Sequence, residues 1–265
     1  MGTEEGYLLD NARTEAGIRF RALGELFDPG TFRRIEALGT GPDLRVWEVG
    51  AGGPTVPEWL ATRFGDVLAT DLDTSWFAAA PGVRALRHDV AEPPPEVGFD
   101  LIHARLVLLH VPDRERALRH LVDALNPGGW LFLEEADPAA QPLICLDEYG
   151  PEQERANRLR RGFRELLAAR GADLAYGRKL PRLLREVGLT EVGAEGYFPI
   201  TSPACVALEA ATVRQIRDQL VDNGLATADE VGQYLGDIEA GRLDLATSPM
   251  ISAWGRKSGI PGGRP

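Results

Sequence analysis

Residues 48–54 of this chain read EVGAGGP, a glycine-rich turn that begins with a carboxylate. Glu48 precedes Gly50 and Gly52, and Asp71 stands at the end of the next apolar run. A glycine-rich turn between a strand and a helix lets a ligand approach the backbone, and the start of the helix presents free N–H groups. These residues therefore predict a ligand site with acidic groups on a strand-to-helix turn.

The pattern of glycines and acids discriminates between two kinds of ligand. A dinucleotide-binding turn has the pattern G-x-G-x-x-G, which would place a third glycine at position 55, where this chain has Thr55. The pyrophosphate of a dinucleotide would also gain little from the carboxylate of Glu48. S-adenosylmethionine has no phosphate and carries a sulfonium and an ammonium group, so acids around its pocket are tolerable or helpful. The residues thus favour S-adenosylmethionine over a nicotinamide dinucleotide.

The elements that must position this turn are short apolar runs that alternate with amphipathic helices. Such runs are mostly apolar on both faces, as parallel strands covered by helices should be. The strands are expected over residues 44–49, 66–71, 83–88, 99–104, 129–135, 190–199 and 248–256. Helices are expected over 14–38 with turn signals at Pro29 and Gly39, over the segment from Asp113 to the sequence NPGG, and over 151–170, 179–188, 203–222 and 227–240. The alternation predicts a right-handed, mostly parallel sheet.

At these residues the chain resembles the class I S-adenosylmethionine-dependent methyltransferases. VWEVGAGGP is similar to their E/D-x-G-x-G-x-G loop, VLATDLD to the segment with the ribose-binding acid, and RHDV to the adenine-contacting segment. FDLIHARLVLLHVPD and LNPGGWLFLEE resemble the segments around their fourth and fifth strands. YLLDNARTEAGIRFRAL is similar to the N-terminal segment of a bacterial branch. The likeness covers about residues 40–136, and the ordered set is more specific than any single motif.

The resemblance implies a fold and a division of the chain. The fold is α/β: a Rossmann-like, mostly parallel seven-stranded sheet with helices on both faces, an N-terminal helical segment and helical insertions near the C-terminal half. Residues 1–40 would form a helical lid or cap, and residues 41–136 the cofactor-binding core. Residues 137–257 would supply acceptor-binding helices and the last strands, and residues 258–265 a flexible tail.

The resemblance also implies roles for single residues. Asp71 would accept hydrogen bonds from the ribose hydroxyls, and Asp89 would bind the adenine amino group. The backbone of the glycine turn would lie against the methionine part, and residues 103–105 would line its exit. The implied cofactor-binding residues are Tyr7, Glu48, Gly50, Gly52, Asp71, Leu72, Asp89, Val90, His103 and Arg105.

One residue departs from the family pattern. A third glycine is expected at position 54, where this chain has Pro54. Proline fixes φ and donates no hydrogen bond, so a pocket that needs this N–H would be weakened. Alternatively, Thr55 and Glu58 have the spacing of a capping box that would start a helix at Val56, with Pro54 stiffening the loop before it. We favour the second interpretation, in which the loop still binds.

The expected reaction is methyl transfer to a small, partly apolar metabolite, on oxygen, nitrogen or carbon, as in secondary metabolism. In-line positioning can supply much of the catalysis, and an amine or phenol acceptor can also need a base. Candidate bases near the ends of the fourth and fifth strands are His103, Glu134, Glu135 and Asp137, of which we select His103 and Asp137. Two alternatives remain: an enzyme that uses bound S-adenosylmethionine without methyl transfer, for cyclisation or rearrangement, and a non-catalytic binding protein.

Composition limits the partners. The net charge of −11 and the pI of about 4.9 disfavour nucleic acid, and no apolar run approaches the ~18 residues of a membrane span. The basic stretch 155–164 is interpreted as a solvated helix face balanced by nearby acids. With two cysteines, no CxxC and no HExxH, no metal site is expected. We expect a cytoplasmic protein without a signal peptide, whose N-terminal helical segment could contribute to a homodimer.

Overall fold

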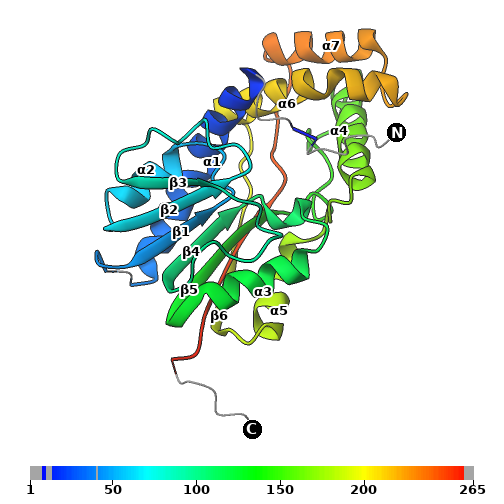
Figure 1. Ribbon diagram of the computed structural model, residues 1–265. Coiled ribbons are helices and arrows are strands. Elements are labelled where there is room, and N and C mark those ends of the chain that lie inside the picture. The colour runs from blue at the N-terminus through cyan, green and yellow to red at the C-terminus, as the bar shows by residue number, and fades with distance from the viewer. Residues whose placement is uncertain (1–7, 10–13, 40, 260–265) are drawn as a thin grey trace, which may run out of the picture. The chain divides into compact units, whose positions relative to one another are not determined.

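The computed structural model describes residues 8–9, 14–39 and 41–259. They form two compact units (Figure 1). The sheet unit comprises the described residues of Phe27–Ala136, Tyr176–Tyr197 and 250–259. The helical unit comprises the described residues up to Leu26, together with Asp137–Ala175 and Phe198–Pro249. The tail 260–265, most of the predicted flexible segment, lies outside the described residues.

The sheet unit is built on seven strands in the order β3-β2-β1-β4-β5-β7-β6. The strands are β1 (Arg45–Val49), β2 (Asp66–Asp71), β3 (Val83–Arg87), β4 (Phe99–Arg105), β5 (Leu125–Ala136), β6 (Thr190–Tyr197) and β7 (Met250–Arg256). The first five strands are mutually parallel, and β7 is antiparallel to both of its neighbours. This sheet confirms the predicted Rossmann-like fold. All parallel strands therefore end at one edge, where a ligand site belongs.

Helices cover both faces of this sheet (Figure 1). One face carries residues 27–37 of α1 (Thr14–Ala37) and the helix α2 (Thr55–Ala61). The other face carries α3 (Arg114–Ala124) and α5 (Leu180–Glu186). Two short 3-10 helices, η1 (Leu108–His110) and η2 (Gly177–Lys179), complete the unit. The helical unit holds the first part of α1 together with α4 (Pro151–Ala169), α6 (Pro203–Asp222) and α7 (Ala228–Glu239).

Two predicted boundaries are wrong. Helix α1 continues through Pro29, where a turn was expected. The φ of proline is compatible with a helix, and the buried side chains on either side of it, Phe27 and Ile35, favour continuation. The sequence NPGG begins β5 rather than ending α3, and the register shift between Phe99 and Leu101 accommodates it. The prediction that Asp113 caps α3 is confirmed, because its carboxylate accepts from the N–H of Arg116.

The core between α1, α2 and the sheet fixes α1 over the strands. Ile35 of α1 and Leu60 of α2 are fully buried against Val46, Leu101 and Phe132 of the sheet. Arg34 of α1 lies 2.6 Å from the carboxylate of Glu195 on β6, and its guanidinium lies 3.7 Å from the ring centroid of Trp254 on β7. Apolar burial of this kind stabilises by about 25 cal/mol per Å². Residues 27–37 are thus fixed against one face of the sheet.

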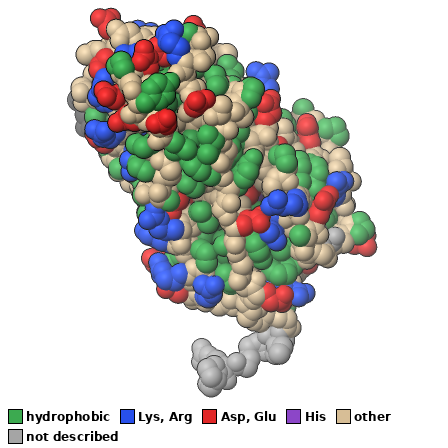
Figure 2. Space-filling model, turned by 180° about the vertical axis from the view of Figure 1, so that it is seen from behind, with side chains coloured by type: hydrophobic (Ala, Val, Ile, Leu, Met, Phe, Trp, Pro, Cys, Tyr) green, Lys and Arg blue, Asp and Glu red, His purple; other side chains and the backbone are tan. Residues whose placement is uncertain are grey.

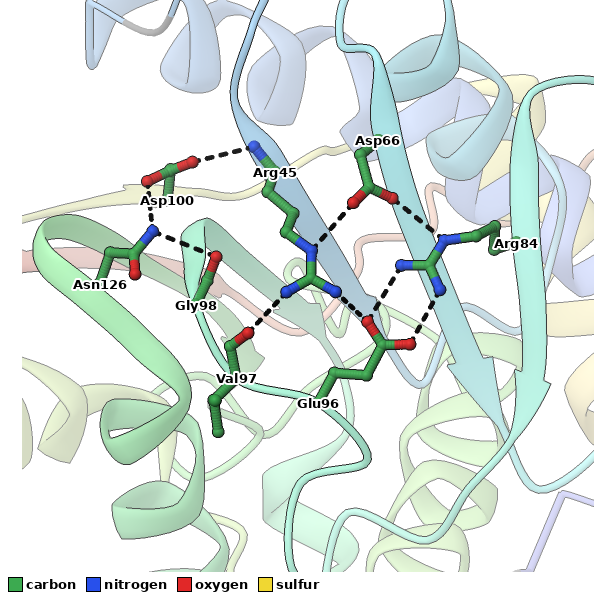
Figure 3. A network of polar contacts seen from close by, with 8 residues as sticks. All are labelled: Arg45, Asp66, Arg84, Glu96, Val97, Gly98, Asp100 and Asn126. Atoms are coloured by element: carbon green, nitrogen blue, oxygen red, sulfur yellow. Dashed lines mark hydrogen bonds and ion pairs between the residues drawn. The ribbon is translucent and has the colours of Figure 1, made fainter.

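A polar network fixes the opposite edge of the sheet (Figure 3). Arg45 of β1 bonds to Asp66 of β2 at 2.9 Å and to Glu96, and Arg84 of β3 bonds to the same two carboxylates. The backbone N–H of Arg45 donates to Asp100 of β4 at 3.0 Å. Although burial opposes it, pairing with the two guanidinium groups lowers the pKa of Asp66. The amino ends of four strands are tied together here, which leaves the carboxyl ends for the site.

The basic stretch of α4 is balanced by acids of the helical unit, as predicted. Arg155 pairs with Asp237, and Arg158 lies 3.1 Å from Glu230. The face is not wholly solvated, because the side chain of Arg160, beside Glu209, is only 11% exposed. Acidic and basic side chains are interspersed over the face drawn in Figure 2. Within the described part of the chain, no helix is long and apolar enough to span a membrane.

Candidate functional site

The glycine turn follows β1 directly and is bonded to the end of β2. Gly50 and Gly52 have φ of +61° and +59°, the left-handed region that glycine enters without strain. The N–H of Ala51 donates to the carbonyl of Thr70 at 3.0 Å, and the N–H of Gly52 donates to Oδ2 of Asp71 at 2.9 Å. The turn and Asp71, both predicted from the sequence to serve one ligand, therefore form one hydrogen-bonded structure.

Asp71 is held with hydrogen-bonding capacity to spare. Its Oδ1 accepts from the N–H of Asp73 at 3.0 Å, so each carboxylate oxygen receives at least one backbone bond. A carboxylate offers about four acceptor positions, which leaves acceptors for the hydroxyl groups of a ligand. Burial raises the pKa of Asp71, while the backbone N–H groups oppose that shift. Leu72, next to it, is 57% exposed and offers an apolar surface beside the acid.

The end of β3 lies beside Asp71. The N–H of His88 donates to the carbonyl of Asp71 at 3.0 Å, which places Asp89 and Val90 just beyond that edge. Asp89 is exposed and accepts from the N–H of Ala91 at 2.9 Å, and Val90 is buried. The predicted ribose and adenine residues thus follow neighbouring strands.

Pro54 is the N-cap of α2, which begins at Thr55, so the predicted capping box is wrong. Pro54 has φ −81° and ψ −21°, Thr55 is already the first helical residue, and the N-cap makes no side-chain bond to the helix. The carbonyl of Pro54 accepts from the N–H of Glu58 at 2.9 Å. The helical φ of proline suits this position, and the missing N–H is one that has no partner within a helix. The turn therefore closes without distortion around the proline.

His103 lies in a buried row of charges beneath α1. Its Nδ1 is 2.6 Å from Glu48 on β1, and its Nε2 is 3.2 Å from Glu134 on β5. All three residues are at most 2% exposed. Burial disfavours the charged imidazole, but the two carboxylates outweigh burial and raise the pKa of His103 to about 9. The charged ring can donate to both carboxylates, which satisfies both nitrogens without a ligand.

Residues of α1 and β7 complete this row. Thr31 donates to Glu134 and accepts from Arg105 at 3.1 Å, and Arg105 lies 2.8 Å from the carboxylate of Asp28 as an ion pair. Ser252 donates to the other oxygen of Glu134 at 2.6 Å. Burial opposes ionisation of Glu134, yet its hydrogen bond to His103 and the charge of that ring lower its pKa overall. Glu48, His103 and Arg105, predicted as cofactor residues, are here tied to one another and to α1.

Two of the predicted site residues remain, Asp137 and Tyr7. Asp137 belongs to the helical unit, is fully buried, and accepts from the N–H of Ala140 at 2.9 Å. Its catalytic role, like that of His103, stays a prediction. Tyr7, the predicted closing residue, lies outside the described residues.

Glu135 is a buried acid that our selection from the sequence omitted. Its side chain lies on the sheet face opposite Glu134, because neighbouring strand residues alternate. Its Oε1 accepts from the N–H groups of Leu108 at 2.6 Å and Val107 at 3.2 Å. Burial raises its pKa to about 8, although those N–H groups oppose the shift. When two adjacent glutamates stand at the end of a strand, their side chains are expected on opposite faces of the sheet, and this pattern is visible in the sequence.

Replacement of Gly50 by alanine is expected to damage the turn. A Cβ atom at this position would overlap Cγ2 of Val107, and the left-handed φ adds strain. We expect a loss of about 1–3 kcal/mol in the free energy of unfolding. Urea titration of Gly50→Ala measures it, with Gly65→Ala as the control, since a Cβ there meets nothing within 4 Å. Equal stability of the two variants would contradict the expectation.

The fold and the site together define a class. A parallel sheet with one antiparallel β7, and a glycine turn hydrogen-bonded to an acid at the end of β2, are features of a Rossmann-like α/β protein with a site at the carboxyl edge. Residues 2–192 match the model of the family described as methyltransferase domain, and the chain belongs to this family.

Several similar proteins are named as methyltransferases. The chain is 34% identical over 161 residues to methyltransferase str2 of Strobilurus tenacellus, covering 57% of this chain and 56% of that protein. It is 30% identical over 171 residues to the ubiquinone biosynthesis O-methyltransferase of Chromobacterium violaceum, covering 59% and 70%. It is 32% identical over 139 residues to the trans-aconitate 2-methyltransferase of Variovorax paradoxus, covering 45% and 54%. The chain thus spans about half the length of several curated relatives.

Solved structures share the fold. Haemonchus contortus phosphoethanolamine N-methyltransferase 2, in complex with phosphomonomethylethanolamine and S-adenosylhomocysteine, matches with a TM-score of 0.59 at 16% identity, over 97% of this chain and 61% of that one. The YcgJ protein from Bacillus subtilis matches with a TM-score of 0.57 at 14% identity, over 90% and 99%. At such identities the likeness supports the fold alone.

Proposed function

We propose that this protein binds S-adenosylmethionine at the glycine turn and transfers its methyl group to a small-molecule acceptor. The observation that carries the proposal is the hydrogen bond from Gly52 to Asp71, which joins the turn to an acid with free acceptor positions. Membership of the methyltransferase-domain family supports the same activity. The cofactor supplies an activated methyl group, and the protein supplies its orientation.

The residues present fit this cofactor. Asp71 would bind the ribose hydroxyls, and the exposed Leu72 would cover one side of the adenine. Asp89, exposed beyond β3, would accept from the adenine amino group. The backbone of Gly50 and Gly52, free of side chains, would lie against the methionine part. Glu48 would not contact the cofactor directly, because its carboxylate bonds to His103. It would instead support the glycine turn from the end of β1.

The chemistry proposed relies on positioning. In the described structure both ring nitrogens of His103 are engaged, so this imidazole is not free to accept a proton from an acceptor. Correct placement of an acceptor along the axis of the transferred methyl group can supply much of the rate enhancement. An acceptor that is already ionised, such as a carboxylate, needs no base.

Calorimetric titration with S-adenosylhomocysteine and with NADH tests the cofactor. We expect micromolar binding of S-adenosylhomocysteine and none of NADH, and the reverse would refute the proposed cofactor.

Incubation with methyl-labelled S-adenosylmethionine and small acids, phenols and amines then tests transfer, with trans-aconitate included because one relative is named for it. Label recovered in an acceptor supports methyl transfer. Turnover of an acceptor without consumption of cofactor would instead support the non-methylating alternative.

A further inference from the structure

Glu135 holds the turn that follows β4. It is fully buried near the end of β5, and its Oε1 receives the backbone N–H groups of Val107 and Leu108. No side chain of that turn contributes to these bonds, so the carboxylate fixes the path of the backbone itself. The second oxygen, Oε2, is buried and has no hydrogen-bond partner among the described residues.

The turn needs such a restraint. Leu106 has φ +59°, a left-handed conformation that non-glycine residues seldom adopt. Its N–H donates to the carbonyl of Glu134 at 2.8 Å, which fixes the start of the turn on β5. Such a conformation costs about 1–3 kcal/mol and persists only where the surrounding structure imposes it. The bonds to Glu135, immediately after Leu106, are part of that structure.

Val107 carries the restraint to the glycine turn. Its two methyl groups occupy the space beside the α-carbon of Gly50, where a Cβ atom would stand. Gly50 begins the turn whose next residues bond to Thr70 and Asp71. A continuous series of contacts therefore runs from Glu135 through Val107 to Gly50, although these residues come from three separate segments of the chain.

We propose that Glu135 is a positioning residue for the cofactor: it holds residues 106–108 so that Val107 presses on Gly50 and keeps the glycine turn in its binding conformation. The inference rests on the proposed function of that turn. Glu135 acts here as an acceptor of hydrogen bonds and needs no negative charge. A different role, in which its free oxygen takes a proton from the acceptor, would require the charge.

The variants Glu135→Gln and Glu135→Ala separate these roles. Glutamine keeps an oxygen that can accept the two N–H bonds but cannot act as a base. We expect Glu135→Ala to weaken binding of S-adenosylhomocysteine by about tenfold or more, and Glu135→Gln to stay within about threefold of the wild type. Unchanged affinity with a lost kcat in Glu135→Gln would identify a base and overturn the proposal. Wild-type affinity in Glu135→Ala would also overturn it.

Two further variants distinguish a specific loss of affinity from a general loss of stability. Leu118→Ala removes a buried side chain of α3 that lies outside this series of contacts, and it should lower the melting temperature without changing the affinity. Val107→Ala leaves the Glu135 bonds intact and removes the methyl groups beside Gly50. We expect it to weaken S-adenosylhomocysteine binding about threefold or more, and unchanged affinity would refute the series of contacts. If the wild-type protein itself binds no S-adenosylhomocysteine, the proposed function fails and this inference fails with it. Wild-type binding with unchanged affinity in Glu135→Ala or Val107→Ala contradicts this inference alone.

Discussion

Replacement of Asp71 by alanine is expected to weaken S-adenosylhomocysteine binding by about 30-fold or more. The variant loses hydrogen bonds between a charged acceptor and the ribose hydroxyls, and a loss of about 2 kcal/mol corresponds to that factor. It also leaves the N–H of Gly52 without the acceptor that now lies 2.9 Å away. Isothermal titration calorimetry of wild type and variant measures the change.

Asp73→Ala is the matched control for this experiment. Asp73 stands two residues along the same loop and accepts a bond from the N–H of Ser75 at 3.0 Å, but it makes no side-chain bond to the glycine turn. We expect its affinity to stay within about threefold of the wild type. Equal losses in the two variants would show that the loop as a whole, and not Asp71, determines affinity.

Replacement of His103 by alanine should cost about 3–5 kcal/mol in the free energy of unfolding. The variant leaves Glu48 and Glu134 buried without the cation between them, and removal of one partner from a buried ion pair is far more costly than loss of an exposed pair. Guanidinium titration measures the loss. His120→Ala, a change to a half-buried histidine of α3, is the control, and we expect a smaller effect.

The pH dependence of stability provides an independent measurement of the same group. The pKa of His103 is raised from 6.5 to about 9 in the folded state, so its contribution is fully present below pH 6.5 and is lost as the pH rises through 9. The pKa of Glu135, raised from 4.5 to about 8, gives a loss in the same direction over a lower, overlapping window. His103→Ala should flatten the upper part of the profile and Glu135→Gln the lower part. Unchanged slopes would contradict the assignments.

Much of the architecture follows from local sequence. The strand 66–71, for example, has an apolar, buried centre at residues 67–69 and acids at both ends, so both the strand and its parallel class could be predicted. The errors arose where tertiary packing overrides local signals. Pro29 stands in a helix whose flanking residues are buried on both sides, and the glycines of 128–129 pair within a strand instead of ending a helix.

One part of the candidate site could likewise be predicted from the sequence, and another part could not. Glycines after one strand and an acid after the next must meet when parallel strands end together, so the contact between Gly52 and Asp71 was predictable. The row from Glu48 to Glu134 was not, because it depends on the register of three strands and on a helix far away in sequence. The signal available was a polar residue within each of three apolar runs, and buried charges are usually paired.

The place of β7 in the sheet has a consequence for synthesis of the protein. β7 comes last in the sequence among the strands, yet it lies between β5 and β6 and pairs with both. Until residues 250–256 have left the ribosome, β5 and β6 each keep an unpaired edge, and such edges favour association with other chains. A nascent or truncated chain that stops before Met250 is therefore expected to be prone to aggregation and dependent on chaperones, even though every residue of the glycine turn has already been made.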